Sequence, residues 1–151
     1  MWLDEWDVET TDILAVIKAE QTRLRKSSVE VVQAAIRKIS TIDGGDPAQF
    51  HPVSADFSIP LRITAGPAES EGEETFDLTV CSPAALEKEC ERDGFVLGRH
   101  RIIVRDYDFR LLRRIIEKLI ARSSGDSWSE VATKIGRIAY WEFEDYEPTS
   151  N

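Results

Sequence analysis

The sequence predicts an α+β fold, in which a mainly antiparallel sheet of about four or five strands is packed by three or four helices. Residues 57–64 and 75–80 alternate between apolar and polar side chains, as strands with one buried face do. Residues 109–120 and 128–138 instead repeat their apolar side chains with the helical period. A chain of 151 residues is also long enough to bury one core without disulfides or metals.

An N-terminal helical extension, residues 1–28, is predicted to precede the main domain, residues 29–151. Its helix begins at Thr11 or Asp12, either of which can cap the first turn. Apolar side chains lie on one face of this helix and in the acidic segment before it: Ile13, Ile17 and Leu24, and Trp2, Leu3 and Trp6. We favour packing of the extension onto its own domain, because a disordered peptide seldom carries two tryptophans. Docking onto another chain is the alternative.

Residues 29–42 fit either a helix or a strand. Ser27 and Glu30 have the spacing of a helical capping box. The segment is nevertheless rich in β-branched side chains, which favour strands: Val29, Val31, Val32, Ile36, Ile39 and Ile42. We therefore expect a strand, followed by a loop at 43–52, where two glycines and two prolines occur.

The alternating segments 57–64 and 75–80 are expected to pair as an antiparallel hairpin. Pro60 has no amide hydrogen to donate to a neighbouring strand, so the first strand should lie at an edge of the sheet or contain an interruption. The polar loop between the two strands, residues 66–74, is longer than most hairpin loops.

A short helix over 84–92 and a further strand over 99–105 come next. Ser82 can cap the helix, and Pro83 suits its first position. Gly94 ends it. The strand has two faces, one with His100, Ile102 and Val104 and the other with Arg99, Arg101 and Arg105.

The strongest helical pattern covers residues 108–122, with Asp106 or Asp108 as the cap. Its outer side is basic in an otherwise acidic protein: Arg110, Arg113, Arg114 and Lys118. We interpret this side as a solvated face, partly neutralised by acidic loops.

The segment 127–138 begins with a capping box and continues as a helix. Ser127 and Glu130 stand three residues apart, so each side chain can accept from a free amide of the first turn. One apolar stripe follows: Trp128, Val131, Ile135 and Ile138.

From Tyr140 the apolar period changes to two, which predicts a half-buried strand. Trp141 and Phe143 point to one side, and Glu142 and Glu144 to the other. A longer helix would place these carboxylates at its negative end, which is unfavourable. The segment is thus either ordinary core with a solvated acidic edge or a rigid acidic recognition surface.

The net charge of the chain limits the classes of partner that it is expected to bind. There are 19 basic and 28 acidic residues, a net charge of −9. This charge repels phosphate backbones and anionic lipid, so we expect neither nucleic acid nor a membrane as partner, whereas a basic protein would be attracted. Carboxylates gather in two stretches without an intervening cation: Glu69, Glu71, Glu73, Glu74 and Asp77, and Glu142, Glu144, Asp145 and Glu147.

Targeting and metal-binding patterns are not evident in the sequence. The first fifteen residues contain no basic side chain, unlike the start of a signal peptide, and no later run approaches the length of a membrane span. We therefore expect a cytoplasmic protein. Cys81 and Cys90 lack the neighbouring ligands of a zinc site and are expected to be buried thiols. No metal and no cofactor is predicted.

Three blocks in this order resemble the immunity protein 8 family of bacterial polymorphic-toxin systems: EGEETFDLTVCSP (71–83), GRHRIIVRDYD (98–108) and SWSEVATKIGRIAYWEFEDY (127–146). The resemblance extends from about Val32 to Pro148. It implies a small cytosolic protein that binds a cognate secreted toxin and blocks its activity. It carries no catalytic residues and no interface positions to transfer.

Binding residues must therefore come from physical argument. An acidic inhibitor is suited to a toxin with a basic active site, such as a nuclease, and we expect the partner to be the toxin's C-terminal domain. The candidate toxin-binding residues combine the two acidic stretches with aromatic side chains as anchors: Glu71, Glu73, Glu74, Tyr140, Trp141, Glu142, Glu144, Asp145 and Tyr146.

Two other functions stay open. The leading alternative is an adaptor or chaperone that holds an effector for secretion. A hydrolase with paired carboxylates comes third. Cys81 and His100 could form a nucleophilic pair, but an oxyanion donor and an orienting group are not evident. We expect no catalytic residue.

Overall fold

A computed structural model of the chain describes residues 13–20 and 31–143. The chain divides into two units, Met1–Val31 and Val32–Asn151. In the first unit, residues 13–20 are helical. The capping residues Thr11 and Asp12 and both N-terminal tryptophans lie outside the described residues. The boundary predicted after residue 28 stays a prediction.

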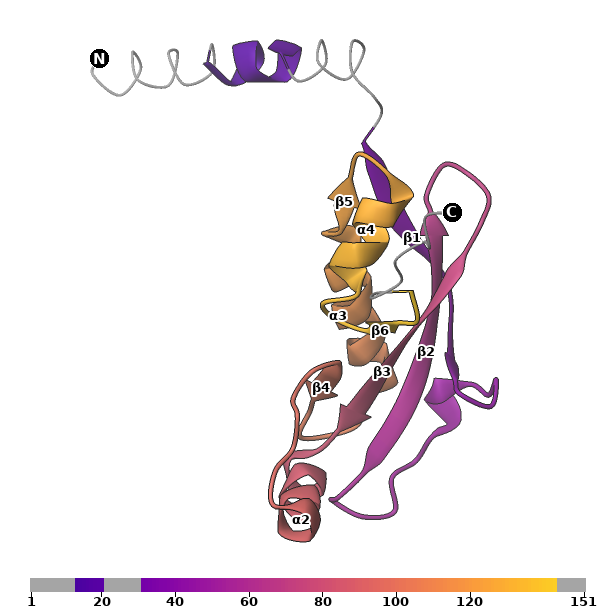
Figure 1. Ribbon diagram of the computed structural model, residues 1–151, viewed down its shortest axis with the longest axis vertical. Coiled ribbons are helices and arrows are strands. Elements are labelled where there is room, and N and C mark those ends of the chain that lie inside the picture. The colour runs from indigo at the N-terminus through magenta and orange to yellow at the C-terminus, as the bar shows by residue number, and fades with distance from the viewer. Residues whose placement is uncertain (1–12, 21–30, 144–151) are drawn as a thin grey trace, which may run out of the picture. The chain divides into compact units, whose positions relative to one another are not determined.

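The second unit is built on a curled mixed sheet, so the predicted α+β fold is confirmed (Figure 1). Its order is β4-β3-β2-β1-β5, with β6 pairing to β3 beside β4. All pairs are antiparallel except β3 with β4. The described strands are β1 (Val32–Thr41), β2 (Ser58–Pro67), β3 (Glu74–Cys81), β4 (Arg101–Ile103), β5 (Ser124–Gly125) and β6 (Tyr140–Trp141). The strand favoured at 29–42 is β1.

The helices begin at the predicted side-chain caps. They are α2 (Pro83–Asp93), α3 (Phe109–Ala121) and α4 (Trp128–Ile135), with a short 3-10 helix, η1 (Pro47–Gln49). Hydroxyl or carboxylate oxygens of Ser82, Asp108 and Ser127 accept from amides of the first turn. The Glu130 carboxylate accepts from the amide of Asp126, so the capping box closes one residue earlier than predicted.

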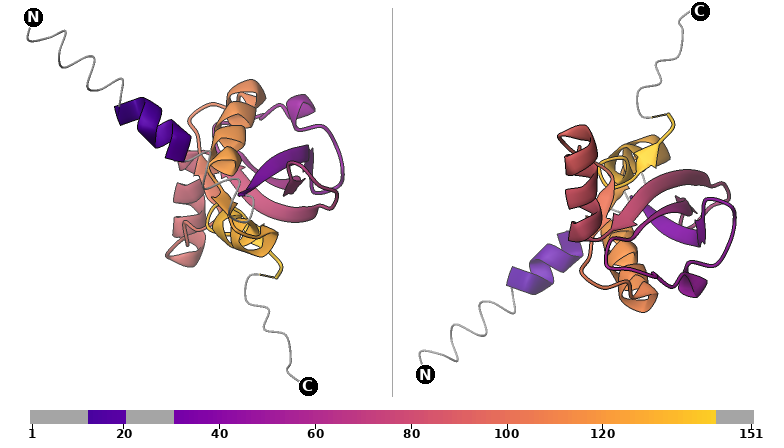
Figure 2. Two further views of the ribbon diagram at one scale, coloured as in Figure 1. Left: turned by 90° about the horizontal axis from the view of Figure 1, so that it is seen from above. Right: turned by 90° about the horizontal axis from the view of Figure 1, so that it is seen from below.

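The core lies between the sheet and the helices α3 and α4, and Figure 2 shows the curl of the long strands from both ends. The alternation predicted for β2 and β3 is confirmed, since every second side chain is buried. α3 and α4 contribute the other half of the core. Its fully buried members include Leu61, Ile63, Phe76, Leu78, Leu112, Ile116, Ile120, Val131 and Ile135.

The position of Pro60 shows how an inner strand tolerates a proline. β2 lies between β1 and β3, but the pairing of β1 with β2 ends at Thr41 and Leu61. Pro60 therefore lies beyond the end of β1, where its missing amide leaves no ladder bond unmade. β2 is therefore an edge strand on this side at Pro60, the first of the two predicted alternatives, while its pairing with β3 continues without interruption.

The predicted strand 99–105 is shorter in the structure. β4 covers three residues and runs parallel to β3. His100 has a φ of 61°, in the left-handed region, which an extended strand cannot continue through. The strand therefore begins only after His100.

Three other predictions are corrected in detail. α4 ends at Ile135, before Gly136, which has a low helix propensity. β6 ends at Trp141, and Glu142 and Phe143 form a turn. Phe143 is therefore 44 % exposed, whereas Trp141 is 8 % exposed. Cys81 is buried as expected, but Cys90 is exposed because it lies on the outer side of α2.

Two adjacent leucines of α3 test the core. Leu112 is 1 % exposed and Leu111 is 49 % exposed. We expect Leu112→Ala to lower the free energy of unfolding by about 2–5 kcal/mol, because it leaves a cavity. Leu111→Ala should change it by less than about 0.5 kcal/mol. Urea unfolding followed by circular dichroism measures both, and equal losses would contradict this assignment of the core.

Candidate functional site

The pairing of β6 with β3 places Glu142, the first residue of the second acidic stretch, close to Asp77 at the end of the first one. Phe76 lies opposite Trp141, and Asp77 lies opposite Tyr140. Glu142 follows Trp141 directly, and Glu73 precedes β3, four positions before Asp77, a distance of about 13 Å along an extended chain. We name the resulting surface the acidic edge, defined by Glu69, Glu71, Glu73, Glu74, Asp77 and Glu142. The candidates Glu144, Asp145 and Tyr146 lie outside the described residues.

A cation from the neighbouring strand β2 partly neutralises the acidic edge, which could not be seen from residue spacing in the sequence. Arg62 of β2 lies opposite Asp77 and donates to both of its carboxylate oxygens, at 2.9 and 3.0 Å. Asp77 raises the pKa of the Arg62 guanidinium above its usual value, and Glu142 adds to this effect. Asp77 belongs to a stretch without an intervening cation, yet a cation of the neighbouring strand pairs with it, and Glu142 is close enough to Arg62 to act on it.

A side chain of β1, Arg37, holds the loop between β2 and β3 by hydrogen bonds. Arg37 donates from Nη2 to the carbonyl oxygens of Pro67, at 2.6 Å, and Ser70, at 3.0 Å. The loop also closes tightly, because a Cβ on Gly66 would lie 2.0 Å from the carbonyl oxygen of Gly72. Arg37 and residues 68–73 line an open hollow of about 540 Å³. The exposed carboxylates of Glu69, Glu71 and Glu73 are thus carried on a loop whose backbone is supported.

Glu74 and Trp141 are placed differently from the other candidates. Glu74 is half-buried, and its Oε2 has no hydrogen-bond partner among the described residues. Trp141 packs against Phe76, with ring centroids 6.3 Å apart, and against Phe143, at 6.0 Å. Because its ring is buried, Trp141 anchors β6 to the hydrophobic core and offers little surface to a partner. Tyr140 is 52 % exposed and presents the accessible ring.

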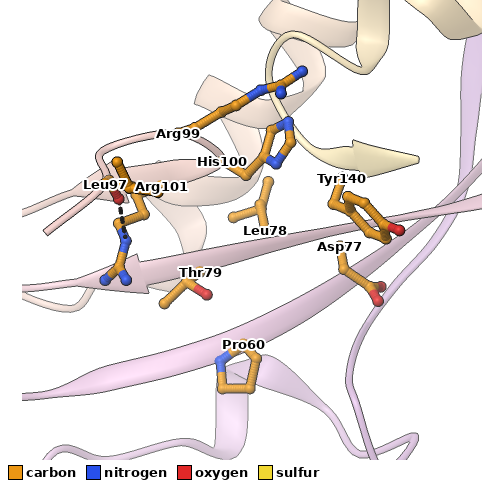
Figure 3. Close-up of a pocket in the computed structure, with 9 residues that line it drawn as sticks. All are labelled: Pro60, Asp77, Leu78, Thr79, Leu97, Arg99, His100, Arg101 and Tyr140. Carbon is orange, nitrogen blue, oxygen red and sulfur yellow. Dashed lines mark hydrogen bonds between the residues drawn. The ribbon is translucent and has the colours of Figure 1, made fainter. Parts of the chain in front are cut away.

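Tyr140 borders an open pocket of about 500 Å³, which lies where β4 and β6 approach each other along β3 (Figure 3). We name it the β4–β6 pocket, lined by Pro60, Asp77, Leu78, Thr79, Leu97, Arg99, His100, Arg101 and Tyr140. Tyr140 and Asp77 belong to both this pocket and the strand pairing that forms the acidic edge.

His100 joins the two sides of the pocket. Its Nε2 lies 2.7 Å from the carbonyl oxygen of Gly136, after α4, and its ring centroid is 6.0 Å from that of Tyr140. Sequence reasoning assigned His100 to a strand face and missed this role, because a left-handed φ at a residue other than glycine has no reliable sequence signal. Such strained residues are concentrated at functional sites.

The described residues offer little for catalysis or metal binding. Among them, no three His, Cys, Asp or Glu side chains come together in a way that could hold a metal ion. The His100 ring is engaged with Gly136 and Tyr140, and the thiol of Cys81 is buried. Within the same residues, no helix has the length and hydrophobicity needed to cross a membrane.

Comparison with known proteins decides the family. The family model described as Immunity protein 8 matches residues 34–146, which include the acidic edge and the β4–β6 pocket. The chain belongs to the immunity protein 8 family. The resemblance carried by the three sequence blocks is thereby confirmed. A search of curated proteins and a search of solved structures gave no match to this immunity protein.

Family membership indicates the general function of the chain. An immunity protein 8 member binds a cognate toxin, and immunity proteins are in general not enzymes.

Two adjacent cations of β1 test the support of the acidic loop. Arg37→Gln removes the two bonds to loop carbonyl oxygens, whereas Lys38→Gln removes the same charge next to it. We expect amide hydrogen exchange at residues 69–73 to accelerate by roughly threefold in Arg37→Gln and to stay unchanged in Lys38→Gln. Mass spectrometry of exchanged peptides measures this, and equal exchange in both variants would show that Arg37 does not hold the loop.

Proposed function

We propose that this immunity protein neutralises the C-terminal domain of a cognate toxin, a basic nuclease-type domain that acts in the cytosol, by covering its active site. Membership of the immunity protein 8 family is the observation that carries this proposal. The toxin's chemistry is inferred from charge. A nuclease must attract a polyanion, so its active site is basic, and an acidic inhibitor uses the same charges.

The acidic edge supports a basic partner. Its six carboxylates include the exposed Glu69, Glu71 and Glu73, and Asp77 is paired with Arg62. The excess of negative charge persists locally, in a chain whose net charge is −9. Charged groups of this kind mainly raise the rate of association with a partner of opposite charge.

We further propose that inhibition is stoichiometric, without a cofactor or a catalytic residue. Aromatic anchors supply most of the affinity in typical interfaces, and Tyr140 is the exposed candidate among the described residues. A cytosolic inhibitor protects against a toxin that acts in the cytosol, so a cell-wall hydrolase is a poor candidate for the cognate toxin.

Co-expression with the cognate toxin tests the proposal. We expect the immunity protein to restore growth and to co-purify with the toxin domain in equal amounts. A folded protein that binds the toxin without restoring growth would indicate an adaptor or chaperone instead. Failure to bind would contradict the proposed function itself.

Charge reversal on the acidic edge should slow association. We expect Glu71→Lys/Glu73→Lys to lower the association rate constant roughly tenfold at low salt and to weaken its dependence on ionic strength. The control, Glu87→Lys/Glu91→Lys, makes the same charge change on exposed positions of α2. Stopped-flow kinetics with an inactive toxin domain distinguishes them. Equal slowing in both variants would mean that only net charge matters.

A further inference from the structure

Large apolar side chains are exposed around the β4–β6 pocket. Leu97 is 74 % exposed and Tyr140 is 52 % exposed, and both line it. On the neighbouring segments, Phe95 is 64 % exposed and Ile103 is 52 % exposed. Soluble proteins seldom gather such side chains at one place on the surface unless a partner covers them.

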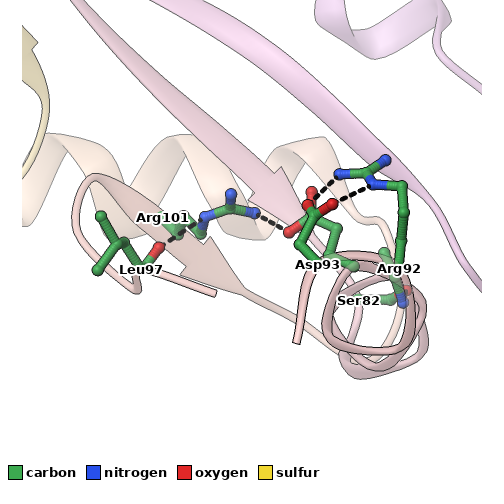
Figure 4. A network of polar contacts seen from close by, with 7 residues as sticks. Ser82, Arg92, Asp93, Leu97 and Arg101 are labelled. Atoms are coloured by element: carbon green, nitrogen blue, oxygen red, sulfur yellow. Dashed lines mark hydrogen bonds and ion pairs between the residues drawn. The ribbon is translucent and has the colours of Figure 1, made fainter. Parts of the chain in front are cut away.

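The three charged side chains that line this pocket all have partners: Asp77, Arg99 and Arg101. Arg62 neutralises Asp77. Arg101 forms an ion pair with Glu89 of α2, at 2.9 Å, and donates from Nε to the carbonyl oxygen of Leu97, at 3.1 Å (Figure 4). Because these charges satisfy one another, the pocket has little to offer an additional charged group and suits an uncharged one.

The same contacts fix the shape of the pocket before any partner arrives. Arg101 ties the loop that carries Leu97 to β4, and through Glu89 to α2. On the opposite side, His100 is held to Gly136 and contacts the Tyr140 ring. A site whose walls are already ordered loses little conformational entropy on binding.

We infer that a large apolar or aromatic side chain of the toxin domain inserts into the β4–β6 pocket, between Leu97 and Tyr140, and anchors the complex. This inference rests on the proposed function. The pocket is continuous with the acidic edge through Asp77 and Tyr140. A basic partner drawn to the acidic edge therefore meets the pocket, whereas a second copy of this chain would bring a second acidic edge to the same place.

Two leucines provide a matched test. Leu97→Asp changes the pocket, and Leu111→Asp makes the same change at an exposed position of α3. The probe is the purified, catalytically inactive C-terminal domain of the cognate toxin, titrated by calorimetry. We expect Leu97→Asp and Tyr140→Ala each to raise the Kd about tenfold or more, mainly through faster dissociation, and Leu111→Asp to leave it within about twofold. Circular dichroism checks the folding of each variant, and Leu97→Ser replaces Leu97→Asp if the latter does not fold.

The outcomes separate this inference from the function on which it rests. Wild-type affinity in both pocket variants would overturn the anchor and leave the proposed function intact. Failure of the wild-type protein to bind the toxin domain would overturn both. A dimer in sedimentation experiments that Leu97→Asp dissociates, with toxin binding unchanged, would assign the pocket to a second copy and overturn the inference.

Discussion

The structure depends on how one edge of β3 is shared. On its other side, β3 pairs with β2 from end to end. On the shared edge it carries two short strands from distant parts of the chain, with β6 along Phe76 and Asp77 and β4 along Thr79 to Cys81. Because β6 is antiparallel and β4 is parallel, the two strands approach each other without merging into one. The space between them is the β4–β6 pocket, and the residues beside β6 belong to the acidic edge.

This arrangement places two kinds of interaction next to each other, and they act over different distances. Charge is felt across about 8 Å at physiological ionic strength, so the carboxylates on the loop before β3 need no fixed side-chain position to attract a partner. Apolar contact acts only when surfaces touch, and it requires walls of defined shape. The distribution of supporting contacts agrees with this division. Hydrogen bonds from Arg37 to backbone carbonyl oxygens hold the loop, whereas ring contacts and ion pairs order the side chains of the pocket.

Much of the fold could be predicted because it depends on neighbours in the sequence. The hairpin of β2 and β3 followed from alternation, and the starts of α2, α3 and α4 followed from Ser82, Asp108 and Ser127. What could not be predicted depends on register between distant strands. Three features are of this kind: the ion pair of Arg62 with Asp77, the hydrogen bonds from Arg37 to the loop, and the parallel pairing of β4 with β3.

The candidate site was predictable to a similar extent. The carboxylates of Glu71, Glu73 and Glu142 could be chosen from the sequence alone. The pairing of β6 with β3, which sets the position of Glu142, could not be predicted. Trp141 shows why. Its alternation correctly indicated a buried ring, and that burial limits the contact surface an anchor would need. The left-handed backbone of His100 delays the start of β4, and His100 lines the pocket; only the structure reveals this.

Arg37 also bears on how such a protein could acquire a new target. It binds carbonyl oxygens of the loop, which every amino acid provides, and none of the loop's side chains. Residues 69, 71 and 73 can therefore vary in type while the backbone keeps its course, provided that Gly66 is retained for the close approach and Gly72 for its positive φ of 108°. Mutation can therefore change the charge pattern of this loop without refolding the domain.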